Sequence, residues 1–336
     1  MTPDGALRTM AGLCTAILAA AALSLAQSVL APVAFALFLI ALAWPLQRGL
    51  EPRLGGAVAM IVTLLVTLTV VAVMVFLAAW GFGRVGGWVI ANAAMLQELY
   101  LRKLEWAAAQ GVEIAPILAE QLNMRSLVRL AQEVLGQLQG LLTFVAVTLV
   151  FMILGLLETG GTARRMQAMG GTAEALLGGF AETASKLRTY MAVRTVMSAL
   201  TGLAVFAFAY AMGLELAAEW GVIAFVLNYI PFIGSFLATL FPTVFAILQF
   251  GSWQSAITVF ASLQVIQFLS GSYIEPRLAG ARLAISPFMV LVAVFLGAFV
   301  WGVPGAFIGV PALIAALTIC ERFEGSRWAA ALLSGK

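Results

Sequence analysis

Six long stretches of the chain contain no charged residue, and this feature constrains the fold more than any other. A helix needs about 20 apolar residues to cross the hydrocarbon core of a bilayer, and each stretch is that long. They are residues 9–47, 54–83, 134–157, 195–214, 220–274 and 283–320. With 63% hydrophobic and only 10% charged residues, the composition excludes a soluble globular domain. The sequence therefore predicts an all-α polytopic membrane protein.

The stretches predict about seven or eight transmembrane segments. The first is long enough for two spans, which separate at Gln27 and Ser28, with Pro32 in the first turn of the second helix. Ser24-Leu25-Ala26 also fits a signal-peptidase site, but we expect this segment to stay as a membrane helix. The predicted parts are three scaffold helices in 1–83, an extramembrane amphipathic helical region in 84–139, and a transmembrane core in 140–336.

The basic residues predict the orientation, because Lys and Arg of short loops stay on the cytoplasmic side. Arg48 and Arg53 follow the second span, and Arg164 and Arg165 follow the fourth. We therefore expect both termini in the cytoplasm.

The residue types present exclude most enzyme chemistry. There is no histidine, and Asp4 is the only aspartate, so Ser-His catalysis, an HExxH site and a paired-aspartate site are absent. Cys14 and Cys320 lie in apolar stretches, and we interpret them as small hydrophobic residues. We predict no enzyme activity, no metal and no cofactor. The net charge of +3 gives no sign of a nucleic-acid partner.

Two of the stretches are interrupted near the C-terminus. Residues 221–230 would make only about 15 Å of helix before a Pro/Gly break. A second break, Gly302-Val303-Pro304-Gly305, divides the last stretch. These patterns predict two broken or re-entrant helical hairpins, at 221–250 and 286–320; proline kinks in a packed bundle are the alternative.

Irregular backbone at membrane depth is tolerated only where protein buries it or a cavity wets it, and secondary transporters use such breaks as binding sites. Amide side chains in a helix bundle also form hydrogen bonds between helices. Such a structural role is the alternative interpretation of Gln264 and Gln267. Glu275 is the candidate coupling group, with Arg277; alternatively it forms a local ion pair with Arg277 or Arg282. The candidate solute path consists of Asn228, Pro231, Gly234, Ser235, Gln264, Gln267, Gly302, Pro304 and Gly305.

Five short motifs occur in a fixed order in the C-terminal part of the chain. They are Asn228-Tyr229-Ile230-Pro231-Phe232-Ile233-Gly234, Ile274-Glu275-Pro276-Arg277-Leu278-Ala279-Gly280, Leu283-Ala284-Ile285-Ser286-Pro287, Trp301-Gly302-Val303-Pro304-Gly305-Ala306 and Val310-Pro311. With these motifs in this order and spacing, the chain resembles the autoinducer-2 exporter (AI-2E) family of permeases. Ser235 stands where that family usually has proline. The resemblance implies a multi-pass membrane transporter that forms homo-oligomers.

The expected function is a secondary transporter or exporter of small polar solutes, autoinducer-2 among them, in the bacterial inner membrane. One alternative that the family allows is a sodium or lithium/proton antiporter. A passive channel and a membrane scaffold are the others. The expected partners are the lipid bilayer and a small polar solute or a monovalent cation.

Overall fold

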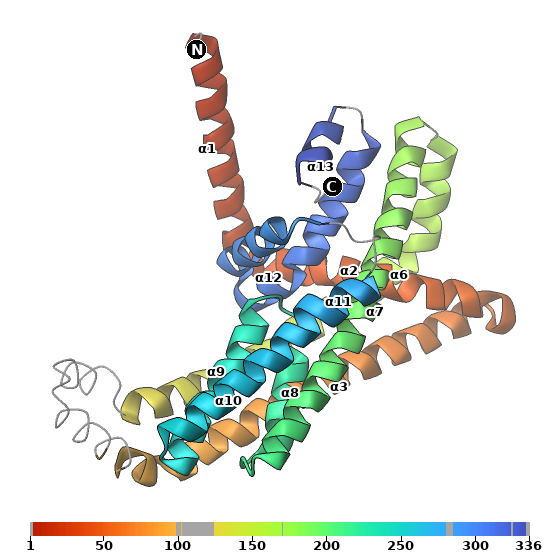
Figure 1. Ribbon diagram of the computed structural model, residues 1–336. Helices are drawn as coiled ribbons and strands as arrows, with labels where there is room; N and C mark the ends of the chain where they lie inside the picture. Colours follow the sequence, from red (N-terminus) through yellow and green to blue (C-terminus); the bar gives the residue numbers. More distant parts are fainter. Residues whose placement is uncertain are drawn as a thin grey trace. The chain divides into compact units, whose positions relative to one another are not determined.

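The structure is a computed structural model that describes residues 3–98, 102, 124–169, 171–279, 285–323 and 325–333 (Figure 1). Helices make up the regular structure of these residues, and no β-strand occurs among them. The predicted all-α fold is confirmed. Much of the expected extramembrane region, and Arg282, lie outside the described residues.

The N-terminal stretch contains two helices, as predicted. α1 (Pro3–Leu25) and α2 (Gln27–Leu54) meet at Ala26. Pro32 does not lie in the first turn of α2, because that helix already begins at Gln27.

Three uninterrupted helices are much longer than the hydrocarbon core requires. They are α3 (Gly56–Ala91), α6 (Met124–Met169) and α7 (Gly171–Ala211). At 1.5 Å per residue they measure roughly 54 to 69 Å, so each extends well beyond a bilayer of about 30 Å. α3 and α6 continue without interruption through residues 83 and 139.

The C-terminal half contains shorter elements and the two breaks. α8 (Ala217–Leu227) and α9 (Ile233–Phe250) are separated by five residues. α12 (Pro287–Arg322) is interrupted at Trp301 and Gly302, whose backbone angles are not helical. The other elements are α10 (Trp253–Phe268), the π-helix η1 (Leu269–Ile274), α11 (Glu275–Ala279) and α13 (Arg327–Leu333).

Among the residues that the structure describes, seven helices are long and apolar enough to cross a membrane. Large apolar side chains such as Leu65, Val73 and Phe76 of α3 are exposed, which suits a surface covered by lipid rather than water. The seven are Gln27–Leu54, Gly56–Ala91, Leu135–Met169, Leu176–Ala211, Ile233–Phe250, Trp253–Ile274 and Pro287–Arg322.

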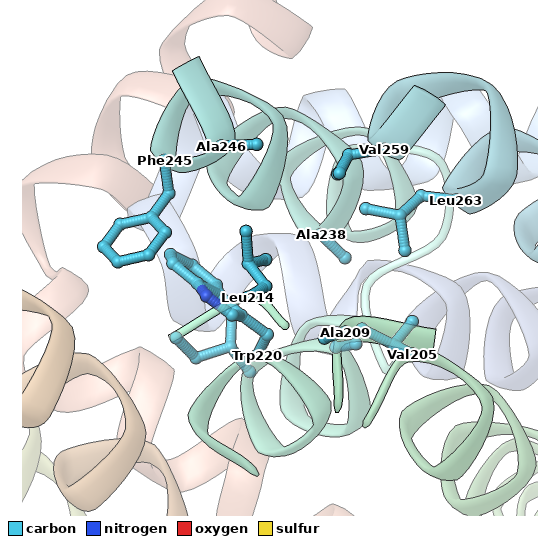
Figure 2. Close-up of a cluster of buried hydrophobic side chains, with 11 residues drawn as sticks. Val205, Ala209, Leu214, Trp220, Ala238, Phe245, Ala246, Val259 and Leu263 are labelled. Carbon is cyan, nitrogen blue, oxygen red and sulfur yellow. The ribbon is translucent and has the colours of Figure 1, made fainter. Parts of the chain in front are cut away.

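The contacts divide the chain into two compact units. Unit 1 comprises Met1–Thr69, Phe144–Met191 and Ala281–Lys336, and unit 2 comprises Val70–Thr143 and Ala192–Gly280. Unit 2 has the larger apolar core, to which α7, α8, α9 and α10 contribute and in which Trp220 of α8 lies against the Phe245 ring of α9 (Figure 2). Its buried members are Val205, Ala209, Leu214, Trp220, Ile223, Ala224, Ala238, Phe245, Ala246, Val259 and Leu263.

Unit 1 contains a smaller apolar core between α2 and α6, and a hydrogen bond from α7 to α2 beside a proline. The smaller apolar core of this unit includes Ala36 and Ala43 of α2 and Met152 of α6. Pro45 has no N–H, so the carbonyl of Ala41 receives no bond from it four residues later. The Arg188 guanidinium of α7 donates a hydrogen bond to that carbonyl over 3.1 Å, so a side chain replaces the missing backbone donor.

Candidate functional site

The turn at residues 228–232 places an amide and a strained residue at the end of α8. Asn228 caps α8, and Phe232 precedes α9 with a φ of 62°, an unusual value for a residue other than glycine. Gly234 lies against the carbonyl of Leu227, where any side chain would collide. The Ser235 hydroxyl donates to the Phe232 carbonyl over 3.0 Å. The predicted break is therefore a tight turn between two packed helices, with Pro231 buried in it.

A polar stripe on α7 faces this turn. The Asn228 amide donates to the Ser198 hydroxyl over 3.2 Å, and the Tyr229 hydroxyl donates to Thr195 over 3.0 Å. Ser198 and Thr201 are fully buried, and the Thr201 hydroxyl has no hydrogen-bond partner among the described residues. The helices can approach this closely because Gly202 of α7 lies directly against α8.

The amides of α10 differ in their surroundings. Gln264 is exposed, whereas Gln267 is half-buried and its amide nitrogen is buried with no hydrogen-bond partner in the described ranges. Ser270, in the π-helix that follows, is buried. Of the two amides predicted to lie on one face, Gln267 is the one that reaches the interior.

Glu275 forms an ion pair that the sequence reasoning missed. Its carboxylate lies 3.3 Å from the Arg194 guanidinium of α7. Arg277 lies instead over the Tyr273 ring, with 3.9 Å between the guanidinium carbon and the ring centroid. The sequence offers one signal for Arg194: it directly precedes the charge-free stretch that carries Thr195 and Ser198.

These side chains form one polar level beside the apolar core of unit 2. On α7, Ser198 lies two helical turns before Val205, which belongs to the core. On α10, Gln267 lies one turn after Leu263, which also belongs to the core. α8 likewise ends at Asn228 after burying Trp220 in the core. We call this level the polar layer; it comprises Arg194, Thr195, Ser198, Thr201, Asn228, Tyr229, Gln267, Ser270 and Glu275.

The other end of unit 2 is closed by a second polar network. Glu219 is 5% exposed, and the Arg84 guanidinium lies 3.1 Å from its carboxylate. The Trp88 indole donates to the Glu215 carboxylate over 2.8 Å, and Gln249 binds the same loop. The apolar core therefore lies between two polar regions.

The second break packs differently. Gly302 has a φ of 62° and ψ of −140°, a conformation that only glycine adopts readily. Gly305 lies against the Gly297 carbonyl although eight residues separate them, so α12 folds back on itself as a hairpin. Gly309 lies in the same way against Ala293, which makes the two arms a small-residue helix contact. Pro304, beside the turn, is partly buried.

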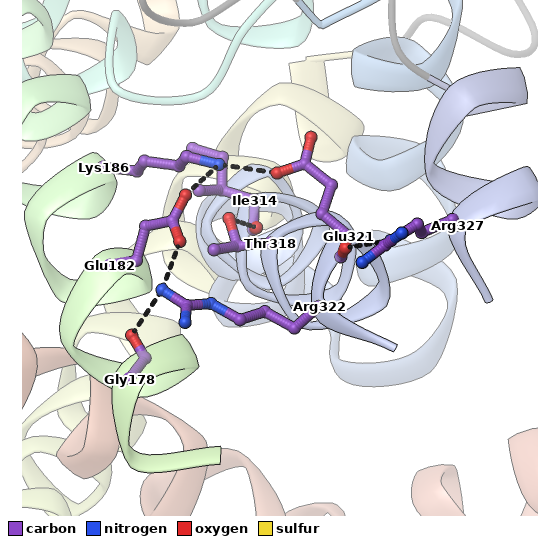
Figure 3. Close-up of polar contacts among 8 residues, drawn as sticks. All are labelled: Gly178, Glu182, Lys186, Ile314, Thr318, Glu321, Arg322 and Arg327. Atoms are coloured by element: carbon purple, nitrogen blue, oxygen red, sulfur yellow. Dashed lines mark hydrogen bonds and ion pairs between the residues drawn. The ribbon is translucent and has the colours of Figure 1, made fainter. Parts of the chain in front are cut away.

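The end of this hairpin is held to α7 by a charge cluster (Figure 3). Glu182 contacts both Lys186, at 3.1 Å, and Arg322, at 2.8 Å. Lys186 also pairs with Glu321 at 3.0 Å. Gly178 accepts a hydrogen bond from Arg322 and leaves room for its guanidinium. The cluster is balanced, with two acidic and two basic side chains.

No group of three or more His, Cys, Asp or Glu side chains that could hold a metal ion occurs in the part of the chain that the structure describes. The fold places the chain among multi-pass α-helical membrane proteins. Residues 13–325 match the family described as "AI-2E family transporter", so the chain belongs to the AI-2E transporter family. The resemblance noted in the sequence is therefore confirmed.

Three curated relatives show the same similarity. The AI-2 transport protein TqsA of Escherichia coli K12 is 28% identical over 65% of this chain and 63% of its own length. A putative transport protein of Borreliella burgdorferi is 32% identical over 45% of this chain and 42% of its own. Putative transport protein YhhT of E. coli K12 is 33% identical over 36% and 35%. In each case the alignment spans less than two thirds of the relative's own length.

Proposed function

We propose that the chain is a secondary transporter that moves a small polar solute across the bacterial inner membrane through the polar layer. The observation that carries this proposal is the incomplete hydrogen bonding of that layer. Within the part of the chain that the structure describes, the Gln267 amide nitrogen and the Thr201 hydroxyl are buried without hydrogen-bond partners, which is costly in a protein interior. A solute with hydroxyl or carbonyl groups would complete these bonds, and Asn228 is placed to exchange its bond with Ser198 for one with the solute.

Autoinducer-2 is the first solute to test, because the relative TqsA is named an AI-2 transport protein. Its small size and polar groups suit a site made of amides and hydroxyls. Pro231, Gly234 and Ser235 belong to the same path in this proposal, since they form the turn beside Asn228.

The proposed topology has both termini in the cytoplasm and the α8–α9 hairpin as a re-entrant segment. The basic residues of the short loops support the orientation. The α8–α9 hairpin with α10 moves during transport in this proposal, and so does the α12 hairpin, with backbone at Gly302, Pro304 and Gly305 exposed as the α12 hairpin opens. We further propose a homo-oligomer, with α1 to α3 and the extramembrane region providing the contacts.

Flux of labelled autoinducer-2 in proteoliposomes tests the proposal. We expect saturable flux that falls by up to about tenfold in Asn228→Ala, because one lost hydrogen bond to a solute is worth about 0.5 to 1.5 kcal/mol. Asn92→Ala is the matched control, since the Asn92 amide also belongs to unit 2 but donates to the Trp88 carbonyl at its other end. Equal flux in the two variants would contradict the role of the polar layer, and steady unsaturable conductance would indicate a channel.

A second candidate function, sodium/proton antiport, is favoured by the Arg194–Glu275 pair alone, because transporters place carboxylates of this kind on ion pathways. Sodium flux driven by a pH gradient, and lost in Glu275→Gln, would establish it. If Glu275→Gln transports at the wild-type rate at every pH tested, Glu275 has no part in coupling. Absence of both fluxes would favour a scaffold.

A further inference from the structure

We propose that the α7–α8 loop (residues 212–216) is a gate, which closes the end of unit 2 opposite the polar layer in this conformation and opens during transport. Glu215 and Trp88 are the positioning residues of this gate, because they hold it shut without contacting the solute. The inference rests on the proposed transport function, to which it adds a control of access to the polar layer.

Three aromatic rings from three helices pack against one another beside this loop. The centroid of the Phe245 ring of α9 lies 4.5 Å from that of Trp88 of α3 and 5.2 Å from that of Trp220 of α8. Phe245 and Trp220 are buried members of the apolar core (Figure 2). Since these rings fill this end of the core, we expect a solute to pass only after they separate.

A single residue of the loop, Glu215, holds all three rings in place. Its carboxylate accepts a hydrogen bond from the Trp88 indole over 2.8 Å, and its backbone carbonyl accepts one from the Trp220 indole over 3.1 Å. Its N–H donates to the side-chain oxygen of Gln249 over 2.8 Å. Gln249 lies one turn after Phe245, on the same face of α9. The carboxylate, the carbonyl and the N–H of Glu215 therefore each bind a helix that carries one of the rings.

The backbone of the loop is strained while these contacts are made. Leu216 has a φ of 59° and a ψ of 32°, the left-handed conformation that residues other than glycine avoid. Gly213 also has a positive φ, and its carbonyl accepts a hydrogen bond from the Gln249 amide over 2.9 Å. A strained residue persists only where its surroundings hold it. Loss of the Glu215 contacts would therefore let the loop relax to a second conformation, as a gate requires.

The hydrogen bond between Trp88 and Glu215 is suited to breaking and re-forming. Trp88 belongs to α3, whereas the loop leads directly into the α8–α9 hairpin, which moves in the proposed mechanism. The bond therefore connects a scaffold helix to a moving part. Because Glu215 is exposed, water can solvate its carboxylate when the indole leaves. Opening this contact thus leaves no buried charge without a partner.

The test is the labelling of a cysteine in the polar layer by a membrane-impermeant thiol reagent, in membrane vesicles of either orientation. Thr201→Cys is the reporter, because Thr201 is fully buried, and the full-length chain also carries Cys14→Ala and Cys320→Ala. We expect Trp88→Phe and Glu215→Ala each to raise the labelling rate about fivefold from the face that carries the loop, since the loss of one hydrogen bond shifts an equilibrium by about this factor. Both variants remove the same bond, so their combination should label no faster than the faster single variant.

Two controls keep the test decisive. Trp253→Phe is the matched variant, since Trp253 is another tryptophan of unit 2 but lies at the start of α10, outside the gate. Ala218→Cys, at an exposed position just after the loop, reports which vesicle orientation presents that face. Unchanged labelling in both gate variants, an equal rise from both faces, or an equal rise in Trp253→Phe would overturn the inference. If one gate variant fails to fold, the other still tests the same bond. Because labelling needs no solute, faster labelling without autoinducer-2 flux would refute only the proposed solute, whereas normal flux with unchanged labelling would refute only the gate.

Discussion

The two helix breaks of this chain have similar sequences but different surroundings. At the first, Asn228 and Tyr229 bind hydroxyl groups of α7, and Phe232 holds a strained conformation. At the second, Gly297 and Gly305 bring two arms of one helix into direct contact. A proline and glycine pattern in a membrane segment therefore marks a break, while the neighbouring helices decide whether the break is polar or dry. We infer that the first break contacts the solute, whereas the second stays closed by contacts between its two arms until the α12 hairpin opens.

Replacement of Gly305 should have the largest effect. Gly305→Leu places a side chain where the Gly297 carbonyl lies, so we expect no folded, monodisperse protein in detergent. Gly305→Ala should lose about 1 to 3 kcal/mol of stability through overpacking. Thermal melting of the purified variants measures both. Gly136→Ala, at a helical glycine with open space around it, is the control and should not destabilise. Normal melting of Gly305→Leu would mean that the arms of α12 are not in contact.

Ser198→Ala should have the next largest effect, and on flux more than on folding. It removes the acceptor of the Asn228 amide and leaves that part-buried donor without this bond, at a cost of about 1 kcal/mol. We expect solute flux to fall several-fold beyond what the melting temperature explains. Thr318→Val is the control, since that buried hydroxyl only bonds to the Ile314 carbonyl of its own helix in unit 1. Similar flux in the two variants would remove the distinction between the breaks.

The charge cluster at the end of the second hairpin should contribute modestly. Glu182→Gln weakens the contacts to Lys186 and Arg322, and because all three side chains are partly exposed we expect a loss of about 1 kcal/mol or less. The difference from wild type should shrink as salt rises, because ions screen partly exposed pairs. Melting at low and high ionic strength measures it, and a difference that grows with salt would contradict an electrostatic origin.

Phe232→Gly should have the smallest effect on stability. Glycine relieves the positive φ of this residue but loses more conformational entropy on folding, so the net gain should be within about 1 kcal/mol. If the strain serves the first break in transport, flux should fall although the protein melts no lower. A variant that gains stability at unchanged flux would assign the strain to packing alone.

The sequence was sufficient for the membrane class, the helical fold and the positions of both breaks. These follow from local patterns: charge-free length, and proline and glycine among apolar residues. It was not sufficient for Arg194, because the partner, Glu275, lies 81 residues away and pairing over that distance depends on how α7 packs against the end of η1. Nor could it show that Gln267 is turned inward while Gln264 is exposed, since both fit one helical stripe.

The Arg188 hydrogen bond in unit 1 has a consequence for the order in which substitutions are tolerated. Arg188 is useful only while Pro45 leaves the Ala41 carbonyl without its backbone donor. If Pro45 were replaced first, the amide of the new residue would take that carbonyl and Arg188 could then be lost at little cost. If Arg188 were replaced first, the Ala41 carbonyl would have no hydrogen-bond donor until Pro45 was also replaced. The two positions should therefore behave as an epistatic pair: a substitution of Arg188 is tolerated only if Pro45 has already been replaced.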